Sequence, residues 1–264
     1  LIVEPAFGEY RKSLELAGCE VLSFLCDENN GFRLNTNALV EWIRTGSSVD
    51  ILYMANPANP TGVLTPLDEM EEILKACEER GVIFVVDEAF CDFTEDASVK
   101  SLVQGSNSLV VFRSMTKFFS LAGLRLGAML APEKLVDSVI DERVPWSINS
   151  LALAFGIGSL ADSDYIKEVR AWFTEESAFM KSELSSIDGL TLFSSSANFF
   201  MLKANGTADV VVKLSERLLE EKILIRGLSE FTGLGGEFFR VAVKKRADNV
   251  RLLDGIKATL KESQ

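Results

Sequence analysis

The chain has 264 residues, of which 47% are apolar and 25% are charged, a balance typical of a globular protein with a sizeable core. Its formal net charge of −12 argues against nucleic acid as a partner, and no apolar run is long enough to span a membrane. The absence of histidine excludes Ser-His-Asp and Cys-His machinery and removes the commonest zinc ligand, so no metal site is predicted. Acid-base chemistry must come from other side chains or from a cofactor.

Apolar, strand-like runs alternate with amphipathic helical stretches through the first half of the chain. A helix is predicted over residues 66–80, with Thr65 as its cap and Gly81 as its end. Because several of the strands are almost entirely apolar, they are expected to be buried on both faces of a mainly parallel sheet. This alternation predicts a doubly wound α/β layer. The candidate strands cover residues 1–3, 21–25, 51–55, 82–87, 109–113 and 126–131.

The second half of the chain has an α+β pattern. We therefore place a domain boundary near Val144, with a large domain over 1–144 and a smaller one over 145–264. Because the chain begins with Leu1 inside a strand-like run and without a Met, we expect the polypeptide to start upstream. Helices are predicted at 163–186, near 208–221 and at the C-terminus, and strands at 190–193, 199–203, 223–226 and 238–243.

The four cysteines are predicted to be reduced and mostly buried thiols, which is typical of a cytosolic protein. None of them forms a CxxC pair, and their flanking residues have the patterns of strands and helices. They are Cys19, Cys26, Cys77 and Cys91.

Two motifs follow predicted strands at the edge where α/β sheets bind ligands. Residues 56–62 read NPANPTG, and the plain alternative for this string is a turn. Residues 85–90 read VVDEAF and place Asp87 at the end of a buried strand. Burying a carboxylate is costly unless a cation or hydrogen bonds compensate, and a protonated pyridine nitrogen would be a suitable partner. The alternatives for Asp87 are a helix cap or a structural ion pair.

A third motif contains a lysine among apolar residues. Residues 113–119 read RSMTKFF, and residues 123–127 read GLRLG. Loss of hydration would leave the amine of Lys117 neutral more often, so that it can attack an aldehyde. Ser114 and Arg125 offer a hydroxyl and a forked cation, which together suit a phosphate. The alternative for Lys117 is a solvated surface charge.

Together, these motifs resemble the class I/II aminotransferase family of pyridoxal-phosphate enzymes, in family order and spacing and over essentially the whole chain. The resemblance implies fold type I, pyridoxal 5'-phosphate as cofactor, a cytoplasmic location, and a homodimer with active sites at the subunit interface. It implies that Lys117 forms the Schiff base, that Asp87 pairs with the pyridinium nitrogen, and that Asn59 donates to the phenolic oxygen. Ser114 and Arg125 would hold the phosphate.

The resemblance also assigns residues around the ring and the substrate. Phe7 would stack on one ring face and Ala89 on the other, the alternative for Phe7 being a core position. Arg240 would bind the substrate carboxylate as a bidentate fork, the alternative being an arginine on a strand edge. Arg226 is a second candidate, with a solvated arginine as its alternative. Asn59 also faces the substrate side of the cofactor.

The chain departs from the family pattern in two places. It has Phe90 where these aminotransferases usually have a tyrosine, which leaves Asn59 as the main donor to the phenolic oxygen and puts transamination in doubt. The family's upstream glycine-rich phosphate cup and N-terminal arm are absent from the sequence.

Within the family the chain is most similar to the threonine-phosphate decarboxylases of cobalamin biosynthesis, with histidinol-phosphate aminotransferases as the sister group. The motifs DEAF at 87–90, RSMTKFF at 113–119, PWSIN at 145–149 and ILIR at 223–226 carry this similarity. It implies decarboxylation of L-threonine O-3-phosphate to aminopropanol phosphate, and thus a small phosphorylated amino acid or amine as substrate. A broad-specificity aminotransferase and a non-catalytic binding module with this fold are the alternatives.

Overall fold

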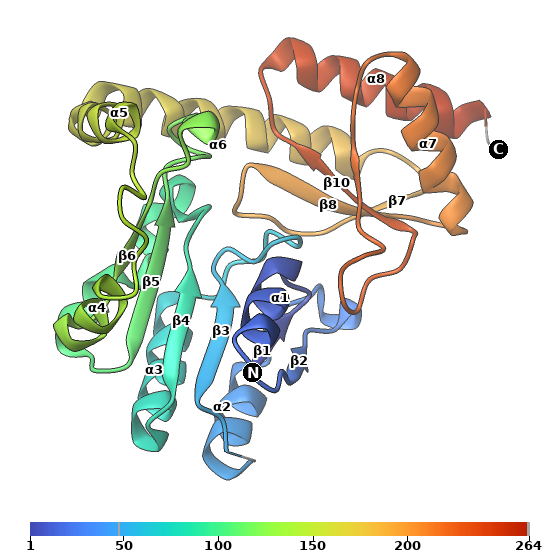
Figure 1. Cartoon of the computed structure of the whole chain (residues 1–264). Helices are drawn as coiled ribbons and strands as arrows, with labels where there is room; N and C mark the ends of the chain where they lie inside the picture. The colour runs from blue at the N-terminus through green and yellow to red at the C-terminus, as the bar shows by residue number, and fades with distance from the viewer. Residues whose placement is uncertain (47, 263–264) are drawn as a thin grey trace.

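The computed structural model describes residues 1–46 and 48–262 and contains two β-sheets. The larger sheet has six strands in the order β2-β1-β3-β4-β5-β6, and the smaller has four in the order β7-β8-β10-β9 (Figure 1). The predicted class, a mainly parallel α/β sheet followed by a smaller α+β part, is confirmed. The division near Val144 stays a prediction.

The larger sheet is parallel except for its last strand, β6, which pairs antiparallel with β5. Its central strands are buried, and their side chains form one apolar core with helices α2 and α3. These helices present one apolar face to the sheet, as their sequence periodicity predicts. The strands are β1 (Ile2–Glu4), β2 (Ser23–Leu25), β3 (Ile51–Ala55), β4 (Ile83–Asp87), β5 (Leu109–Ser114) and β6 (Gly127–Leu130), and the helices are α1 (Gly8–Leu16), α2 (Thr36–Thr45), α3 (Leu67–Arg80) and α4 (Glu133–Ile140).

The smaller sheet is antiparallel and packs against three helices through a second core. The long helix α6 runs from beside the larger sheet to the smaller one (Figure 1). The strands are β7 (Leu190–Leu192), β8 (Phe199–Ala204), β9 (Arg226–Gly227) and β10 (Phe238–Ala242), and the helices are α5 (Ser150–Ala161), α6 (Ser163–Ser185), α7 (Ala208–Glu220) and α8 (Arg246–Glu262).

The two parts also meet in an aromatic cluster beneath α6. Phe173 of α6 packs with Phe93, Phe118 and Phe119, which come from loops at the edge of the larger sheet. Tyr165, also on α6, donates a hydrogen bond from its hydroxyl to the carbonyl of Phe118 at 2.9 Å. Helix α6 therefore holds the residues that directly follow Lys117.

Two local predictions are wrong. Thr65 does not cap α3: the helix has Pro66 at its N-cap position, and the N–H and carbonyl of Thr65 both bond to the side chain of Asn56, at 2.8 and 3.0 Å. Residues 223–225 do not form a strand, since β9 begins only at Arg226. Gly81 does end α3, in the left-handed conformation that glycine adopts readily.

Candidate active site

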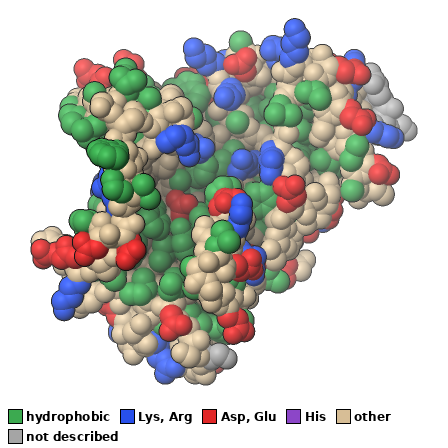
Figure 2. Space-filling model, viewed as in Figure 1, with side chains coloured by type: hydrophobic (Ala, Val, Ile, Leu, Met, Phe, Trp, Pro, Cys, Tyr) green, Lys and Arg blue, Asp and Glu red, His purple; other side chains and the backbone are tan. Residues whose placement is uncertain are grey.

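The predicted site residues of the larger sheet lie where β3, β4 and β5 end. Because these strands are parallel neighbours, their carboxyl ends meet at one edge, and Asp87 and Ser114 are the last residues of β4 and β5. Lys117 lies close enough to Asp87, Arg125 and Arg240 for all three charges to act on it. Figure 2 shows that the surface is hollowed between the two parts of the molecule and that acidic and basic side chains both appear there.

Asp87 is fixed by two hydrogen bonds. Its Oδ2 accepts from the hydroxyl of Tyr10, and its Oδ1 accepts from the N–H of Ala89 at 2.9 Å. Burial raises the pKa of Asp87, while the bonds from Tyr10 and Ala89 and the charge of Lys117 oppose this rise. The carboxylate is thus held in one orientation in a place that favours a cationic partner.

Asn59 lies in a loop whose shape is set by its neighbours. The buried side chain of Asn56 spans the loop to the backbone of Thr65. Gly62 has φ +78°, and a Cβ there would lie 2.1 Å from Oγ of Ser195, so a larger residue would displace the loop. The carbonyl of Gly62 accepts from the N–H of Ser196 at 2.8 Å, which ties this loop to the smaller part of the chain.

Lys117 lies in the loop after β5 and is exposed. Phe118 and Phe119 are buried beneath it and support the loop. They do not enclose the amine, whereas the sequence predicted a lysine among apolar residues. Partial loss of hydration, followed by the charges of Arg240 and Arg125, lowers the pKa of Lys117, and Asp87 opposes this. A lowered pKa favours the neutral amine that attacks a carbonyl.

The proposed phosphate ligands flank the lysine loop. The hydroxyls of Ser114 and Thr116 are 2.7 Å apart, which adds a second hydroxyl to the predicted one. Arg125 is exposed, with φ +56°, and donates to the carbonyl of Ala122 at 3.0 Å. Its guanidinium therefore has further N–H groups for an anion.

Arg240 on β10 reaches across to the larger sheet. Its Nη1 donates to Oδ1 of Asn59 at 2.5 Å, and its guanidinium lies 4.5 Å from the centre of the Phe199 ring. Arg226 on β9 lies opposite Arg240 in the strand register. Burial lowers the pKa of Arg240, and the like charge of Arg226 lowers it further. Arg226 itself is exposed and pairs with Glu230 at 3.0 Å.

The two residues predicted on the faces of the cofactor ring differ in exposure. Phe7 is 44% exposed, so it is not a core residue, and its ring meets that of Tyr10 edge to face at 5.8 Å. Ala89 is partly buried. Phe90 packs edge to face on Phe199 at 5.0 Å, and Nζ of Lys117 lies 5.8 Å from its centre.

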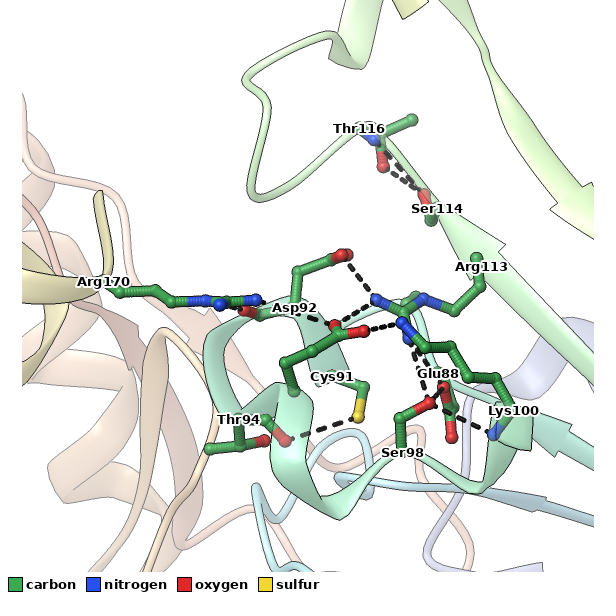
Figure 3. Close-up of polar contacts among 12 residues, drawn as sticks. Glu88, Cys91, Asp92, Thr94, Ser98, Lys100, Arg113, Ser114, Thr116 and Arg170 are labelled. Carbon is green, nitrogen blue, oxygen red and sulfur yellow. Dashed lines mark hydrogen bonds and ion pairs between the residues drawn. The ribbon is translucent and has the colours of Figure 1, made fainter. Parts of the chain in front are cut away.

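Sequence reasoning missed two groups of residues beside the site. Tyr10 was given no role, although its position three residues after Phe7 at the start of a helix places both on one face. Its ring also stacks on Tyr53 at 4.3 Å. The second group surrounds Arg113, which contacts three carboxylates (Figure 3). No short-range sequence signal could identify these partners, because the three carboxylates lie at residues 88–95 and Arg113 lies on the next strand.

The family model for aminotransferase class I and II matches residues 1–256. The chain belongs to this family. Threonine-phosphate decarboxylase from Salmonella typhimurium is 31% identical to it over 262 residues, which cover 98% of this chain and 70% of the relative. The chain therefore spans about 70% of that relative's length.

Two solved structures extend the comparison. The histidinol-phosphate aminotransferase from Clostridium acetobutylicum has a TM-score of 0.91 at 30% identity. The match covers 99% of this chain and 77% of the aminotransferase chain. The L-threonine-O-3-phosphate decarboxylase from Porphyromonas gingivalis has a TM-score of 0.82 at 26% identity and covers 98% and 76%. These relatives confirm the expected family and its sister group.

Pyridoxal 5'-phosphate is the cofactor of this family. The residues of this chain fit it chemically: an oriented buried carboxylate, an exposed aromatic face, an amine with a lowered pKa, and hydroxyl and guanidinium donors for a phosphate. Among the described residues there is no helix long and apolar enough to cross a membrane, and no cluster of side chains suited to a metal ion.

Arg240→Lys should raise KM for a carboxylate substrate. A lysine keeps the charge but loses the fork, and a hydrogen bond to a charged group contributes about 1.5–3 kcal/mol, or roughly 10- to 100-fold. Steady-state kinetics measure this effect, with Arg226→Lys as the matched variant. An equal or larger rise in KM from Arg226→Lys would assign the carboxylate to Arg226 instead.

Proposed function

We propose that the chain decarboxylates L-threonine O-3-phosphate to aminopropanol phosphate, using pyridoxal 5'-phosphate, as a step in cobalamin biosynthesis. The observation that carries the proposal is the pair of arginines on adjacent strands, Arg226 and Arg240. Two cations side by side suit a substrate with two anionic groups, and threonine phosphate has both a carboxylate and a phosphate. The similarity to two threonine-phosphate decarboxylases supports this choice.

The proposed site residues act as follows. When bound, the cofactor supplies a ring that accepts the electron pair of the broken Cα–carboxylate bond. Asp87, oriented by Tyr10, would keep the ring nitrogen protonated. Lys117 would hold the cofactor covalently through Nζ and, once the substrate amine had freed it, would supply a proton from Nζ to Cα. Carbon dioxide leaves, and the amine product keeps the phosphate.

Other residues orient the cofactor and the substrate. Asn59 donates to the phenolic oxygen, and its bond to Arg240 links cofactor and substrate positions. Ser114 and Arg125 would bind the cofactor phosphate, while Phe7 and Ala89 would cover the ring faces. The placement of the substrate carboxylate would decide which bond at Cα breaks, and thus the reaction.

A single paired assay tests the function. The holoenzyme is given O-phosphothreonine, and CO2 release is measured; in parallel it receives histidinol phosphate with a keto-acid acceptor. Stoichiometric CO2 without a keto product is the expected result. Amino transfer from histidinol phosphate without CO2 would move the chain to its sister group, which the TM-score of 0.91 keeps as the second candidate.

Phe90→Tyr should lower the pH midpoint at which the bound cofactor changes its absorbance. A hydroxyl there would give the phenolic oxygen a second donor and stabilise its deprotonated form. One hydrogen bond contributes about 1 kcal/mol, which corresponds to a shift of up to about one pH unit. An absorbance titration measures it, with Phe179→Tyr on α6 as the control. An unchanged midpoint would mean that Phe90 does not face the phenolic oxygen.

We also propose that the protein is a cytoplasmic homodimer. Helix α5 and the segment before it expose many large apolar side chains, and a helix that is apolar all round is normally buried against another surface. The exposed apolar residues are Val144, Trp146, Ile148, Leu151, Leu153, Phe155, Ile157 and Leu160. Light scattering of the purified protein tests the dimer.

The cysteines support the cytoplasmic location. All four are free, which is typical of a reducing compartment.

A further inference from the structure

A buried ion-pair cluster lies directly beneath the candidate active site. Its centre is Arg113 on β5, whose side chain is only 14% exposed. Nη1 of Arg113 lies 2.9 Å from Oε2 of Glu88, and Nη2 lies 2.5 Å from Oδ1 of Asp92 and 2.6 Å from Oε2 of Glu95 (Figure 3). One guanidinium thus contacts three carboxylates that come from the segment directly after β4. We call these four residues the Arg113 cluster.

Glu88 is the most constrained member of the cluster. Its side chain is fully buried, and both carboxylate oxygens are occupied. Oε1 accepts from the N–H of Val99 at 2.7 Å, and Oε2 accepts from the hydroxyl of Ser98 at 2.6 Å as well as from Arg113. Burial raises the pKa of Glu88, and these hydrogen bonds and the charge of Arg113 oppose the rise. A group held on every side cannot rotate without breaking several bonds.

The two central residues of the cluster, Glu88 and Arg113, are direct sequence neighbours of proposed site residues. Glu88 directly follows Asp87, the proposed partner of the cofactor ring nitrogen. Arg113 directly precedes Ser114, the first proposed phosphate ligand, and lies four residues before Lys117. In the parallel pairing of β4 with β5, Asp87 lies opposite Phe112. The ion pair therefore joins the two strand ends that would hold opposite ends of one cofactor.

We propose that Arg113 is a positioning residue which, through Glu88, fixes the distance between the ring-nitrogen site at Asp87 and the phosphate and Schiff-base site at Ser114 and Lys117. The inference rests on the proposed site residues and not on the choice of substrate. A buried ion pair is by itself weak evidence for stability, because desolvation offsets much of the attraction. A role in fixing the distance between the two strand ends explains why the ion pairs lie beside the proposed site.

Two further basic residues, Lys100 and Arg170, contact the cluster at Glu95. Lys100 forms an ion pair with Glu95, and Arg170 of α6 lies 3.8 Å from Oε2 of Glu95 and 5.9 Å from the ring centre of Phe118. Burial alone would lower the pKa of Arg113, but the bonds and charges of Glu95 and Asp92 outweigh burial and raise it. The guanidinium of Arg113 therefore stays charged.

The test compares cofactor affinity with stability in the same variants. Arg113→Lys keeps one charge but cannot reach all three carboxylates, and Glu88→Gln keeps the shape and one acceptor but loses the ion pair. Displaced strand ends would lose hydrogen bonds to charged groups of the cofactor, and one such bond contributes roughly tenfold or more to binding. We therefore expect each variant to bind pyridoxal phosphate at least tenfold more weakly, with a shifted pH midpoint of the cofactor absorbance.

Two controls separate positioning from a general loss of stability. Arg44→Met removes an ion pair of similar length, 2.8 Å to Glu79, on the exposed side of α2 and should leave cofactor affinity unchanged. Ile73→Ala opens a cavity in the core under the sheet and should lower the melting temperature without changing the absorbance midpoint. If the cluster variants lost cofactor affinity only as much as a core variant with the same melting temperature, the positioning role would be refuted.

A double variant completes the test and covers the case in which one single variant fails to fold. Arg113→Met with Glu88→Gln, compared with each of these changes alone, removes both charges of this pair and does not leave Glu88 as a buried unpaired carboxylate. If Arg113 acts through Glu88, the double variant should bind cofactor about as weakly as the worse single variant, since both remove the same link. Additive losses, or wild-type affinity in the folded double variant, would overturn the proposal. Cofactor binding is measured without substrate, so an error in the proposed reaction leaves this result interpretable.

Discussion

Lys117→Ala is expected to abolish the Schiff-base absorbance of the bound cofactor and to lower kcat by about 10²–10⁴-fold or more, since the proposed mechanism gives Nζ both the covalent link and the proton return. Cofactor should still bind, because Asp87, Ser114 and Arg125 remain. Substrate would then bind a cofactor that is held only by non-covalent contacts.

Lys117 is exposed, so its side chain contributes little to the stability of the fold. Its removal should hardly change the melting temperature, so a loss of activity cannot be blamed on unfolding. Lys213→Ala, an exposed lysine on α7, is the matched control and should retain full activity. If Lys117→Ala kept the Schiff-base absorbance or measurable turnover near the wild-type level, the assignment of the reactive lysine would be wrong.

Asp87→Asn is expected to lower turnover and to stabilise the cofactor-free protein. Without the anion the ring nitrogen loses the charge that keeps it protonated, and since one fixed electrostatic contact contributes about 10²–10³-fold, turnover should fall on that scale. The same change should stabilise the cofactor-free protein at neutral pH, because the buried carboxylate is the less favourable form there.

The pH dependence follows from the direction of the shift. Burial raises the pKa of Asp87 above 3.8 in the folded state, so between 3.8 and that raised value the folded state keeps a proton which the unfolded state has lost. The wild-type protein therefore loses stability relative to Asp87→Asn as pH rises through this window, and the difference should vanish below pH 3.8. Urea unfolding of the cofactor-free proteins at several pH values measures it, with Asp188→Asn as an exposed control. A destabilised Asp87→Asn protein at neutral pH would contradict the argument.

The central strands and motifs could be predicted from the sequence because their signals are local. Continuous apolar runs defined β3, β4 and β5 to within a residue or two, and parallel strands necessarily bring their last residues to one edge. The placement of Asp87, Ser114 and Lys117 near one another follows from that rule alone.

What could not be predicted depends on contacts between distant segments. The bond from Tyr10 to Asp87 joins residues 77 apart, and the Arg113 cluster joins β5 to the segment after β4. Residues 223–225 are as apolar as a strand, but only Arg226 and Gly227 pair with β10. Helix α5 is apolar on every side, so it lacks the amphipathic period by which helices are recognised.

The contacts of α6 also bear on how such an enzyme can be divided or recombined. A cut near Val144 follows the sequence pattern, yet it would remove Tyr165 and Phe173 from the aromatic cluster that supports Phe118, the residue after Lys117. A chimera that joined residues 1–144 to the small part of a relative would therefore inherit a foreign support for its own reactive lysine. Because Met180 and Leu184 of the same helix pack in the second core, an exchange that moved α6 with the larger sheet would break contacts of the smaller part in turn.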